Sequence, residues 1–192
     1  MWIGPPPEAI EEMGDKLRSR ARMRKAGVPV VPGSEEGAAD DRSLGRRAEE
    51  LGYPVLVKAS AGGGGRGIRL VNSSDELDEA FERAGSEALK TAEDATVFLE
   101  RAIRGGRHVE VQVLADGTRA VALGDRDCSV QRRYQKLLEE APAPLLSAEQ
   151  VELLRSSAAE LVRAAGYVNA GTVEFLYEPE ERLLSFLEVN TR

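Results

Sequence analysis

The sequence predicts an α+β fold, in which helices are interspersed with antiparallel strands joined by turns. Two apolar runs suited to strands, Val55–Ala59 and Ile68–Val71, flank a loop that holds five glycines between positions 62 and 67. Residues 108–114 place apolar and polar side chains on opposite faces, as a half-buried strand requires. Near the end of the chain, two further apolar strands within 171–190 are separated by a polar turn and predict a hairpin.

The other elements follow from helix and turn signals. A rough apolar stripe at Ile10, Met13 and Leu17 predicts a helix that Gly27 ends. Ser147 is the predicted cap of the last helix. In chain order we expect helix 8–26, an extended segment 28–33, helix 44–51, strands 55–59 and 68–71, helix 74–89, strand 95–100, strands 108–114 and 119–123, a charged loop 124–144, helix 147–165, and strands 171–177 and 183–190.

Composition limits the class of protein. The 192 residues carry a net charge of −7, which argues against a chain whose whole surface binds nucleic acid. A single cysteine, Cys128, excludes an intramolecular disulfide and fits a reducing compartment. No apolar run approaches the roughly 20 residues of a membrane helix, and the first residues lack the features of a signal peptide. We therefore expect a cytoplasmic protein without nucleic-acid or membrane partners.

The glycine loop is a candidate phosphate site. Glycines let backbone N–H groups approach a ligand closely, and Lys58 adds a positive charge beside them. The spacing GxGxxG occurs, but a strand rather than a helix is predicted to follow it. No Gly-Lys-Ser/Thr follows the loop, and the protein-kinase triplets are absent. A flap over phosphates between two strands remains, with a plain hairpin tip as the alternative.

The C-terminal hairpin carries carboxylates inside apolar strands. Glu174 and Glu188 lie within these strands, and Asn190 shares the face of Glu188. Buried charges are costly without partners, and Mg²⁺ on nucleotide phosphates commonly takes one or two carboxylate ligands. The hairpin therefore predicts a divalent-metal site, with pairing to arginine as the structural alternative.

Two other polar groups, and Lys16 on the first helix, allow a structural as well as a functional interpretation. One face of the strand 108–114 holds His108, Glu110 and Gln112. The charged loop holds Arg132, Arg133 and Lys136. The first face is either a ligand site or the solvent side of a hairpin, and the basic cluster is either a solvated surface or an anion pocket. By itself, Lys16 is typical of a solvated helix lysine.

Taken together, these segments resemble the biotin carboxylase component of acetyl-CoA, propionyl-CoA and pyruvate carboxylases, which are ATP-grasp enzymes. The resemblance covers nearly the whole chain, in order. The stretch Arg126–Pro142 separates this family from carbamoyl-phosphate synthetases, which share the flap and the metal hairpin. The matching runs are Met13–Lys16, Ala26–Pro29, Gly52–Val55, Lys58–Ser60 with Gly62–Gly67, Arg107–Asp116, Arg126–Arg133, Gln135–Lys136, Glu139–Pro142 and Glu188–Arg192.

The resemblance implies an ATP-grasp fold with a glycine-flap lid subdomain and part of an antiparallel-sheet metal-binding subdomain. The implied segments are an N-terminal helical and extended linker, 1–57, the lid, 58–105, and the metal- and bicarbonate-binding subdomain, 106–192. The implied ATP-binding residues are Lys16, Lys58, Gly64, Gly65, Glu100, Arg101, Ile103, His108, Gln131 and Tyr134. The implied ligands of Mg²⁺ or Mn²⁺ are Glu174, Glu188 and Asn190, and Lys136 and Arg192 would bind bicarbonate as catalytic residues.

The implied reaction is ATP-dependent carboxylation of biotin, in which bicarbonate attacks the γ-phosphate and the resulting carboxyphosphate delivers CO₂ to biotin. The implied partners are a biotin carboxyl carrier protein or domain, a carboxyltransferase and further copies of the parent enzyme. The location would be the cytoplasm, or the mitochondrial matrix if the parent is eukaryotic. A nucleotide-binding fragment without turnover and a related ATP-grasp ligase, such as carbamoyl-phosphate synthetase, are the alternatives.

Two departures from the family pattern affect these expectations. Tyr134 stands where many members have histidine or asparagine, although its hydroxyl can still donate one hydrogen bond to a nucleotide. The chain also looks truncated, because the family pattern has a further N-terminal domain. After Arg192 that pattern continues with a segment that carries the glutamate proposed as the base for bicarbonate.

Overall fold

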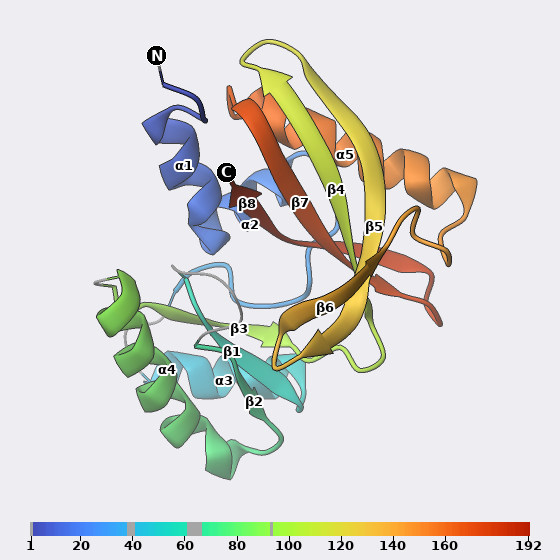
Figure 1. Ribbon diagram of the computed structural model, residues 1–192. Helices are drawn as coiled ribbons and strands as arrows, with labels where there is room; N and C mark the ends of the chain where they lie inside the picture. The colour runs from blue at the N-terminus through green and yellow to red at the C-terminus, as the bar shows by residue number, and fades with distance from the viewer. Residues whose placement is uncertain (1, 38–40, 61–66, 93) are drawn as a thin grey trace. The chain divides into compact units, whose positions relative to one another are not determined.

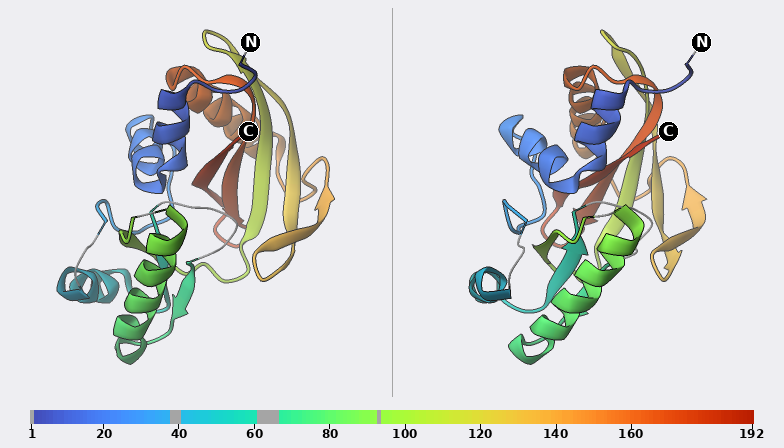
Figure 2. Two further views of the ribbon diagram at one scale, coloured as in Figure 1. Left: turned by 60° about the vertical axis from the view of Figure 1, so that its left-hand side comes forward. Right: turned by 90° about the vertical axis from the view of Figure 1, so that its left-hand side faces the viewer.

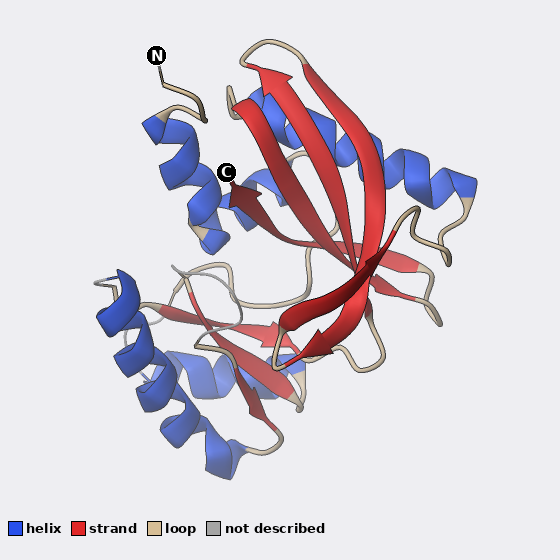
Figure 3. Cartoon of the chain, viewed as in Figure 1, coloured by secondary structure: helices blue, strands red, loops and turns tan. Residues whose placement is uncertain are grey.

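The computed structural model describes residues 2–37, 41–60, 67–92 and 94–192, without the side chains of residues 41, 42, 91 and 92. Helices and two antiparallel sheets confirm the predicted α+β class (Figure 3). Contacts divide the chain into two compact units. Unit 1 comprises Met1–Val30 and Gly105–Arg192, and unit 2 comprises Val31–Arg104.

Unit 1 is built on a five-stranded antiparallel sheet (Figure 1). The strand order is β6-β5-β4-β7-β8. Its strands are β4 (Arg107–Asp116), β5 (Ala120–Arg132), β6 (Gln135–Glu140), β7 (Val168–Glu178) and β8 (Leu183–Thr191). The predicted strand at 108–114 and the C-terminal hairpin are therefore confirmed.

The prediction of a charged loop over 124–144 is wrong, because most of this segment forms β5 and β6. In β5 the usual polarity of a strand is inverted, since Asp125 and Asp127 are buried while Val121 and Leu123 are exposed. The carboxylate of Asp125 accepts hydrogen bonds from Arg155 Nε at 2.9 Å and from the Ala143 backbone N–H at 2.9 Å. These partners compensate the buried charge. Because charged residues occupy buried positions, β5 lacks the apolar alternation from which a strand is predicted.

Helices pack against the sheet of unit 1 (Figures 1 and 2). Helix α5 (Ala148–Ala164) lies against β4 and β5, and it begins with the expected cap, Ser147, in a capping box with Gln150. The single helix predicted for 8–26 is instead two helices, α1 (Pro7–Gly14) and α2 (Lys16–Lys25), which both contact β8. They are separated at Asp15, whose carboxylate caps α2 by accepting from the backbone N–H groups of Leu17 and Arg18.

The core of unit 1 lies between these helices and one face of the sheet. It includes Met13, Met23, Val109, Val111, Val113, Leu154, Leu161, Val173, Phe175, Phe186 and Val189, all buried. Because side chains alternate along a strand, the polar residues between these positions lie on the opposite face. That face carries the candidate site.

Unit 2 is a three-stranded antiparallel sheet with two helices. Its strands are β1 (Val55–Ala59), β2 (Arg69–Val71) and β3 (Val97–Arg101), in the order β2-β1-β3. Its helices are α3 (Asp41–Leu51) and α4 (Leu77–Ala92), the latter preceded by a 3₁₀ turn, η1 (Ser74–Glu76). Both helices contribute to a separate core with Val55, Val57, Val97 and Leu99. The predicted strands on either side of the glycine loop are confirmed.

The two ends of unit 2 are joined to each other. Gly33 bridges Glu100, and the Arg101 N–H donates to the Pro32 carbonyl at 2.8 Å. The segment boundaries predicted after residues 57 and 105, and the roles predicted for the three segments, stay predictions. Among the described helices, none has the length and apolar character needed to span a membrane.

Candidate functional site

A row of acidic side chains crosses the sheet of unit 1 in register. Glu110 of β4 lies opposite Glu174 of β7, and Glu174 lies opposite Glu188 of β8. On the other side of Glu110, the partner position on β5 is Arg126. Like charges directly opposite each other on neighbouring strands destabilise a sheet. The row is therefore stable only if cations compensate it.

Glu174, at the centre of the row, is buried and has three polar partners. Its Oε1 accepts from Asn190 Nδ2 at 2.6 Å and from Lys136 Nζ at 2.9 Å. His108 Nε2 lies 2.8 Å from its Oε2, in a contact that departs from the direction of a hydrogen bond. Burial raises the pKa of Glu174, but His108, when protonated, and Lys136 outweigh it and lower that pKa to about 2.

Lys136 joins two carboxylates of the row. Its ammonium group contacts Glu110 as well as Glu174, and Glu110 also accepts from Arg126 Nε at 2.7 Å. Burial lowers the pKa of Lys136, but its hydrogen bonds to the two glutamates outweigh burial and raise it. Lys136 is therefore a permanent cation within the row, and not the solvated surface lysine of the structural interpretation.

The third carboxylate, Glu188, pairs with the first residue of α2. Lys16 Nζ lies 3.4 Å from Glu188 Oε2, and 13% of the Lys16 side chain is exposed. Lys16 thus differs from an ordinary solvated helix lysine. The structure therefore joins five predicted site residues of unit 1 by direct contacts around Glu174: His108, Gln131, Lys136, Glu174 and Asn190. Glu188, which pairs with Lys16, lies on the next strand, opposite Glu174 in register.

A chain of hydrogen bonds holds His108. Its ring atom Nδ1 lies 2.7 Å from Gln131 Nε2, and the same amide nitrogen donates to the Cys128 carbonyl at 2.8 Å. Its backbone N–H donates to Ser129 Oγ at 2.9 Å. The Ser129 N–H in turn donates to Asp127, whose pKa stays low because the hydrogen bonds from Ser129 and Arg107 outweigh its burial.

The predicted metal ligands fit a hard divalent cation. Glu174, Glu188 and Asn190 offer the carboxylate and amide oxygens that Mg²⁺ prefers, on neighbouring strands and one face. Asn190 donates its amide nitrogen to Glu174, which leaves its oxygen for another partner. Thr172, which lies opposite Asn190, has a buried hydroxyl without a hydrogen-bond partner among the described residues. Such an orphaned polar atom beside the row is consistent with a ligand site.

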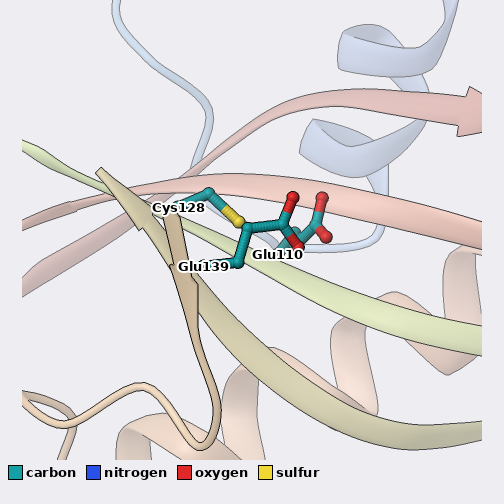
Figure 4. A group of neighbouring side chains, drawn as sticks. All are labelled: Glu110, Cys128 and Glu139. Atoms are coloured by element: carbon teal, nitrogen blue, oxygen red, sulfur yellow. The ribbon is translucent and has the colours of Figure 1, made fainter. Parts of the chain in front are cut away.

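A second group of possible ligand atoms lies nearby but is less suited to a metal (Figure 4). Glu110, Cys128 and Glu139 direct one ligand atom each to within 4.8 Å of the others. Burial, followed by the charge of Glu110, raises the pKa of Cys128 to about 12, so the thiol stays protonated. Both carboxylates already contact Arg126. We interpret this group as part of the ion-pair network.

Two other predicted residues of unit 1 lie outside this network. Tyr134 is exposed at the turn between β5 and β6, where it and Arg133 both have positive φ, 63° and 52°. Arg192 is also exposed, and its backbone N–H donates to the Tyr167 hydroxyl at 3.1 Å. Their predicted contacts with ATP and bicarbonate stay predictions.

In unit 2 the predicted ATP-binding lysine already has a partner. Lys58 forms an ion pair with Glu100, whose side chain is only 2% exposed. A buried carboxylate of this kind holds the lysine ammonium at the end of β1. Arg101 and Ile103 are partly exposed at the end of β3 and just beyond it. The predicted contacts of Gly64 and Gly65 fall outside the described residues.

Both described ends of the glycine segment are fixed by hydrogen bonds within unit 2. Ser60 Oγ donates to Asp94 at 3.1 Å, and hydrogen bonds from Thr96 lower the pKa of Asp94. The Gly67 N–H donates to Glu87 Oε2 at 3.2 Å. A carboxylate therefore anchors each side of the segment.

Sequence reasoning missed two members of the network, Glu110 and Arg126, as site residues. Glu110 had a signal, since it shares the predicted strand face with His108. Arg126 lay in a stretch that matches the family, but the loop expected there gave no reason to place its side chain beside Glu110.

The sheet with its row of carboxylates, and a second unit that carries a lysine before a glycine-rich segment, define an ATP-binding domain of the ATP-grasp class. Residues 15–192 match the family described as carbamoyl-phosphate synthase L chain, ATP binding domain, and the chain belongs to that family. The similar proteins include biotin carboxylases, such as biotin carboxylase 1 of Bacillus subtilis, which is 45% identical over 192 residues, all of this chain and 43% of that protein. A pyruvate carboxylase subunit of Methanothermobacter thermautotrophicus is 49% identical over 191 residues, which are 99% of this chain and 38% of that protein.

Solved structures agree with this assignment. The biotin carboxylase complex with beta-gamma-ATP from Campylobacter jejuni matches with a TM-score of 0.94 at 44% identity, over 98% of this chain and 42% of that one. The biotin carboxylase domain dimer of Hydrogenobacter thermophilus 2-oxoglutarate carboxylase, in complex with MgADP, ADP and bicarbonate, matches with a TM-score of 0.93 at 48% identity. This match covers 98% of this chain and 42% of that one. The chain thus spans about two fifths of the length of these relatives, and the resemblance inferred from the sequence is confirmed.

Proposed function

We propose that this chain is the ATP-binding core of a biotin carboxylase and serves the ATP-dependent carboxylation of biotin by bicarbonate through carboxyphosphate. The observation that carries the proposal is the acidic row of unit 1, where Glu174 and Glu188 lie in register beside Lys136. A nucleotide triphosphate needs a divalent cation held by such carboxylates, and a small anion needs a fixed ammonium group. The similar Hydrogenobacter domain, in complex with MgADP and bicarbonate, supports the same pairing of ligands.

The residues of unit 1 divide into two roles. Glu174, Glu188 and Asn190 would hold Mg²⁺ or Mn²⁺, which when bound would neutralise phosphate charge during phosphoryl transfer. Lys136 and Arg192 would bind and orient bicarbonate as it attacks the γ-phosphate. Because Lys136 is charged at all moderate pH values, it acts by position and charge and not by exchanging a proton.

The proposed ATP contacts are distributed over both units. They are Lys16, His108, Gln131 and Tyr134 in unit 1, and Lys58, Gly64, Gly65, Glu100, Arg101 and Ile103 in unit 2. Biotin on a carrier protein or domain would be the carboxyl acceptor, and a carboxyltransferase would use the product. A homo-oligomer in the cytoplasm is the setting that we propose, and the Hydrogenobacter domain is itself a dimer.

The proposal is tested by removing one negative charge from the row. In the protein that carries this chain, Glu188→Gln should abolish biotin- and bicarbonate-dependent release of ADP, because a metal ligand is lost. Glu181→Gln makes the same change in the exposed turn of the same hairpin and should leave the rate unchanged. An unchanged rate in Glu188→Gln would contradict the proposed role of the row.

The family description itself names a second candidate, a ligase that forms carbamoyl phosphate. Analysis of the products separates the two, since only a biotin carboxylase makes ADP release depend on biotin. Calorimetry of this chain with MgATP supplies a further test. Binding without biotin-dependent ADP release would identify a nucleotide-binding domain without turnover of its own.

A further inference from the structure

The hydrogen bonds of Gln131 fix the orientation of its amide. Its Nε2 lies 2.8 Å from the Cys128 carbonyl oxygen and 2.7 Å from His108 Nδ1. A backbone carbonyl oxygen only accepts hydrogen bonds, so the atom facing it must be the NH₂ nitrogen of the amide. The second hydrogen of that NH₂ group is then directed to His108.

This amide determines which nitrogen of His108 carries the proton. Because Gln131 donates to Nδ1, Nδ1 must accept with its lone pair, and the proton of the neutral ring lies on Nε2. Nε2 is the atom 2.8 Å from Glu174 Oε2. The backbone N–H of His108 donates to Ser129 Oγ, so the backbone and the ring are each held by a hydrogen-bond partner from β5.

We propose that Gln131 is a positioning residue that holds His108 in the tautomer with the proton on Nε2. His108 then carries an N–H group, and not a lone pair, on the ring nitrogen that lies 2.8 Å from Glu174, a proposed metal ligand. The imidazole is thereby kept out of the ligand set, which consists of oxygens alone. This inference rests on the proposed function for the identity of Glu174, Glu188 and Asn190 as metal ligands.

The consequence is selection among metal ions. A neutral imidazole with a free lone pair is a good ligand for Zn²⁺, whereas carboxylate and amide oxygens suit Mg²⁺ and Mn²⁺. A histidine lone pair beside the Glu174 carboxylate would otherwise favour Zn²⁺. The orientation of one amide thus discriminates against the wrong metal, and the same N–H suits an oxygen atom of a nucleotide.

The tautomer is directly measurable, because His108 is the only histidine in the chain. A chain labelled with ¹⁵N-histidine, without a histidine tag, gives one pair of ring nitrogen signals at about pH 8, where a free imidazole is neutral. We expect a proton on Nε2 and none on Nδ1. A proton on Nδ1 in the unmodified chain would overturn the proposal, and this result depends on no variant and no enzymatic assay.

Substitution of Gln131 by glutamate tests its role. In Gln131→Glu, a carboxylate replaces the donor, so Nδ1 should gain a proton and the spectrum should change accordingly. Gln135→Glu adds the same charge at an exposed position of β6 and should leave the His108 signals unchanged. An unchanged protonation of Nδ1 in a folded Gln131→Glu chain, with folding checked by circular dichroism, would refute the role of Gln131.

Metal binding supplies a second readout. Calorimetry with Zn²⁺ and Mg²⁺ should show that Gln131→Glu raises the affinity for Zn²⁺ by about tenfold or more relative to Mg²⁺, a typical size for a change beside a metal ligand. Adding His108→Asn should remove that gain, and Gln135→Glu should not produce it. A gain that survives His108→Asn would overturn the metal-selection part. A biotin carboxylase assay that fails while the tautomer is as expected would count against the proposed function alone.

Discussion

Glu174 illustrates how a buried carboxylate keeps its charge. Burial alone would favour the neutral acid, but Lys136, Asn190 and His108 converge on its two oxygens. Removal of one partner of such a group is costly because the remaining charge stays buried. A bound cation would supply the same kind of compensation that the ammonium group of Lys136 supplies in this structure.

The pKa of Glu174 predicts an acid-sensitive part of the stability. Its folded pKa of about 2 lies below the ordinary value of 4.5, so ionised Glu174 stabilises the fold above about pH 4.5. That contribution, on the order of 3 kcal/mol, is lost as the pH falls from about 4.5 towards 2. In urea unfolding, the free energies of unfolding of the unmodified chain and of Glu174→Gln should differ most at about pH 7. The difference should shrink as the pH falls to about 3. Parallel pH profiles would contradict this assignment.

Asp125 provides a second test of burial, in a different place. Its side chain is fully buried and accepts from Arg155 and from the Ala143 N–H, so it joins β5, α5 and the segment before α5. In Asp125→Asn, an NH₂ group must face one of these donors, which should lower the free energy of unfolding by about 3 kcal/mol. The exposed Glu160, which pairs with Arg163 on α5, is the control. Glu160→Gln should cost about 0.5 kcal/mol or less. Equal losses in urea unfolding would contradict the argument.

At the scale of elements, β5 and β6 show where reasoning from sequence stops. The strand 108–114 and the C-terminal hairpin were predictable because most of their apolar residues lie in the core and recur in the pattern of a strand. In β5 the buried positions include Asp125 and Asp127, and the side chains of β6 are exposed except for that of Lys136, which is partly buried. Their pairing depends on partners in β4 and α5, which no local pattern reveals. The division of the first helix at Asp15 was missed for a similar reason, because only the structure shows that its carboxylate caps α2.

The candidate site could likewise be predicted only where a local sequence pattern reveals it. Glu174, Glu188 and Asn190 were identifiable because polar residues interrupt an otherwise apolar hairpin. Their neighbours come from strands that are distant in sequence. The contact between Lys136 and Glu174 joins β6 to β7, two strands that are not adjacent in the sheet. Spacing alone does not contain that information.

The turn between β5 and β6 carries local strain. Arg133 and Tyr134 both adopt positive φ in a two-residue hairpin loop, where asparagine and glycine are the favoured residues. Arg133→Asn should raise the free energy of unfolding by roughly 0.5–1 kcal/mol, because asparagine tolerates this conformation better. Arg132→Asn, one residue earlier in β5 and also exposed, should bring no gain. A gain no larger than that of Arg132→Asn in urea unfolding would show that the turn is not strained.

At the scale of the whole molecule, the chain consists of one continuous and one discontinuous unit. Unit 2 is a single segment, whereas unit 1 is assembled from residues before and after it. The two buried cores share no residue. Each unit therefore has a core of its own, and each contains some of the residues that we propose to bind ATP.

The hydrogen bonds at the ends of unit 2 predict that it folds alone. Arg101 bonds to Pro32, while Ser34 and Leu99 exchange two hydrogen bonds, so the first and last residues of the unit hold each other. A domain that is inserted in this way retains its own core when it is excised. A chain of residues 31–104 should therefore unfold cooperatively in urea, with a modest stability expected for so small a core. A matched chain of residues 36–104 lacks these end contacts, and the midpoint of its unfolding should lie at a lower urea concentration. Absence of a cooperative transition in the longer chain, or equal midpoints for the two, would show that the closure of unit 2 does not stabilise it.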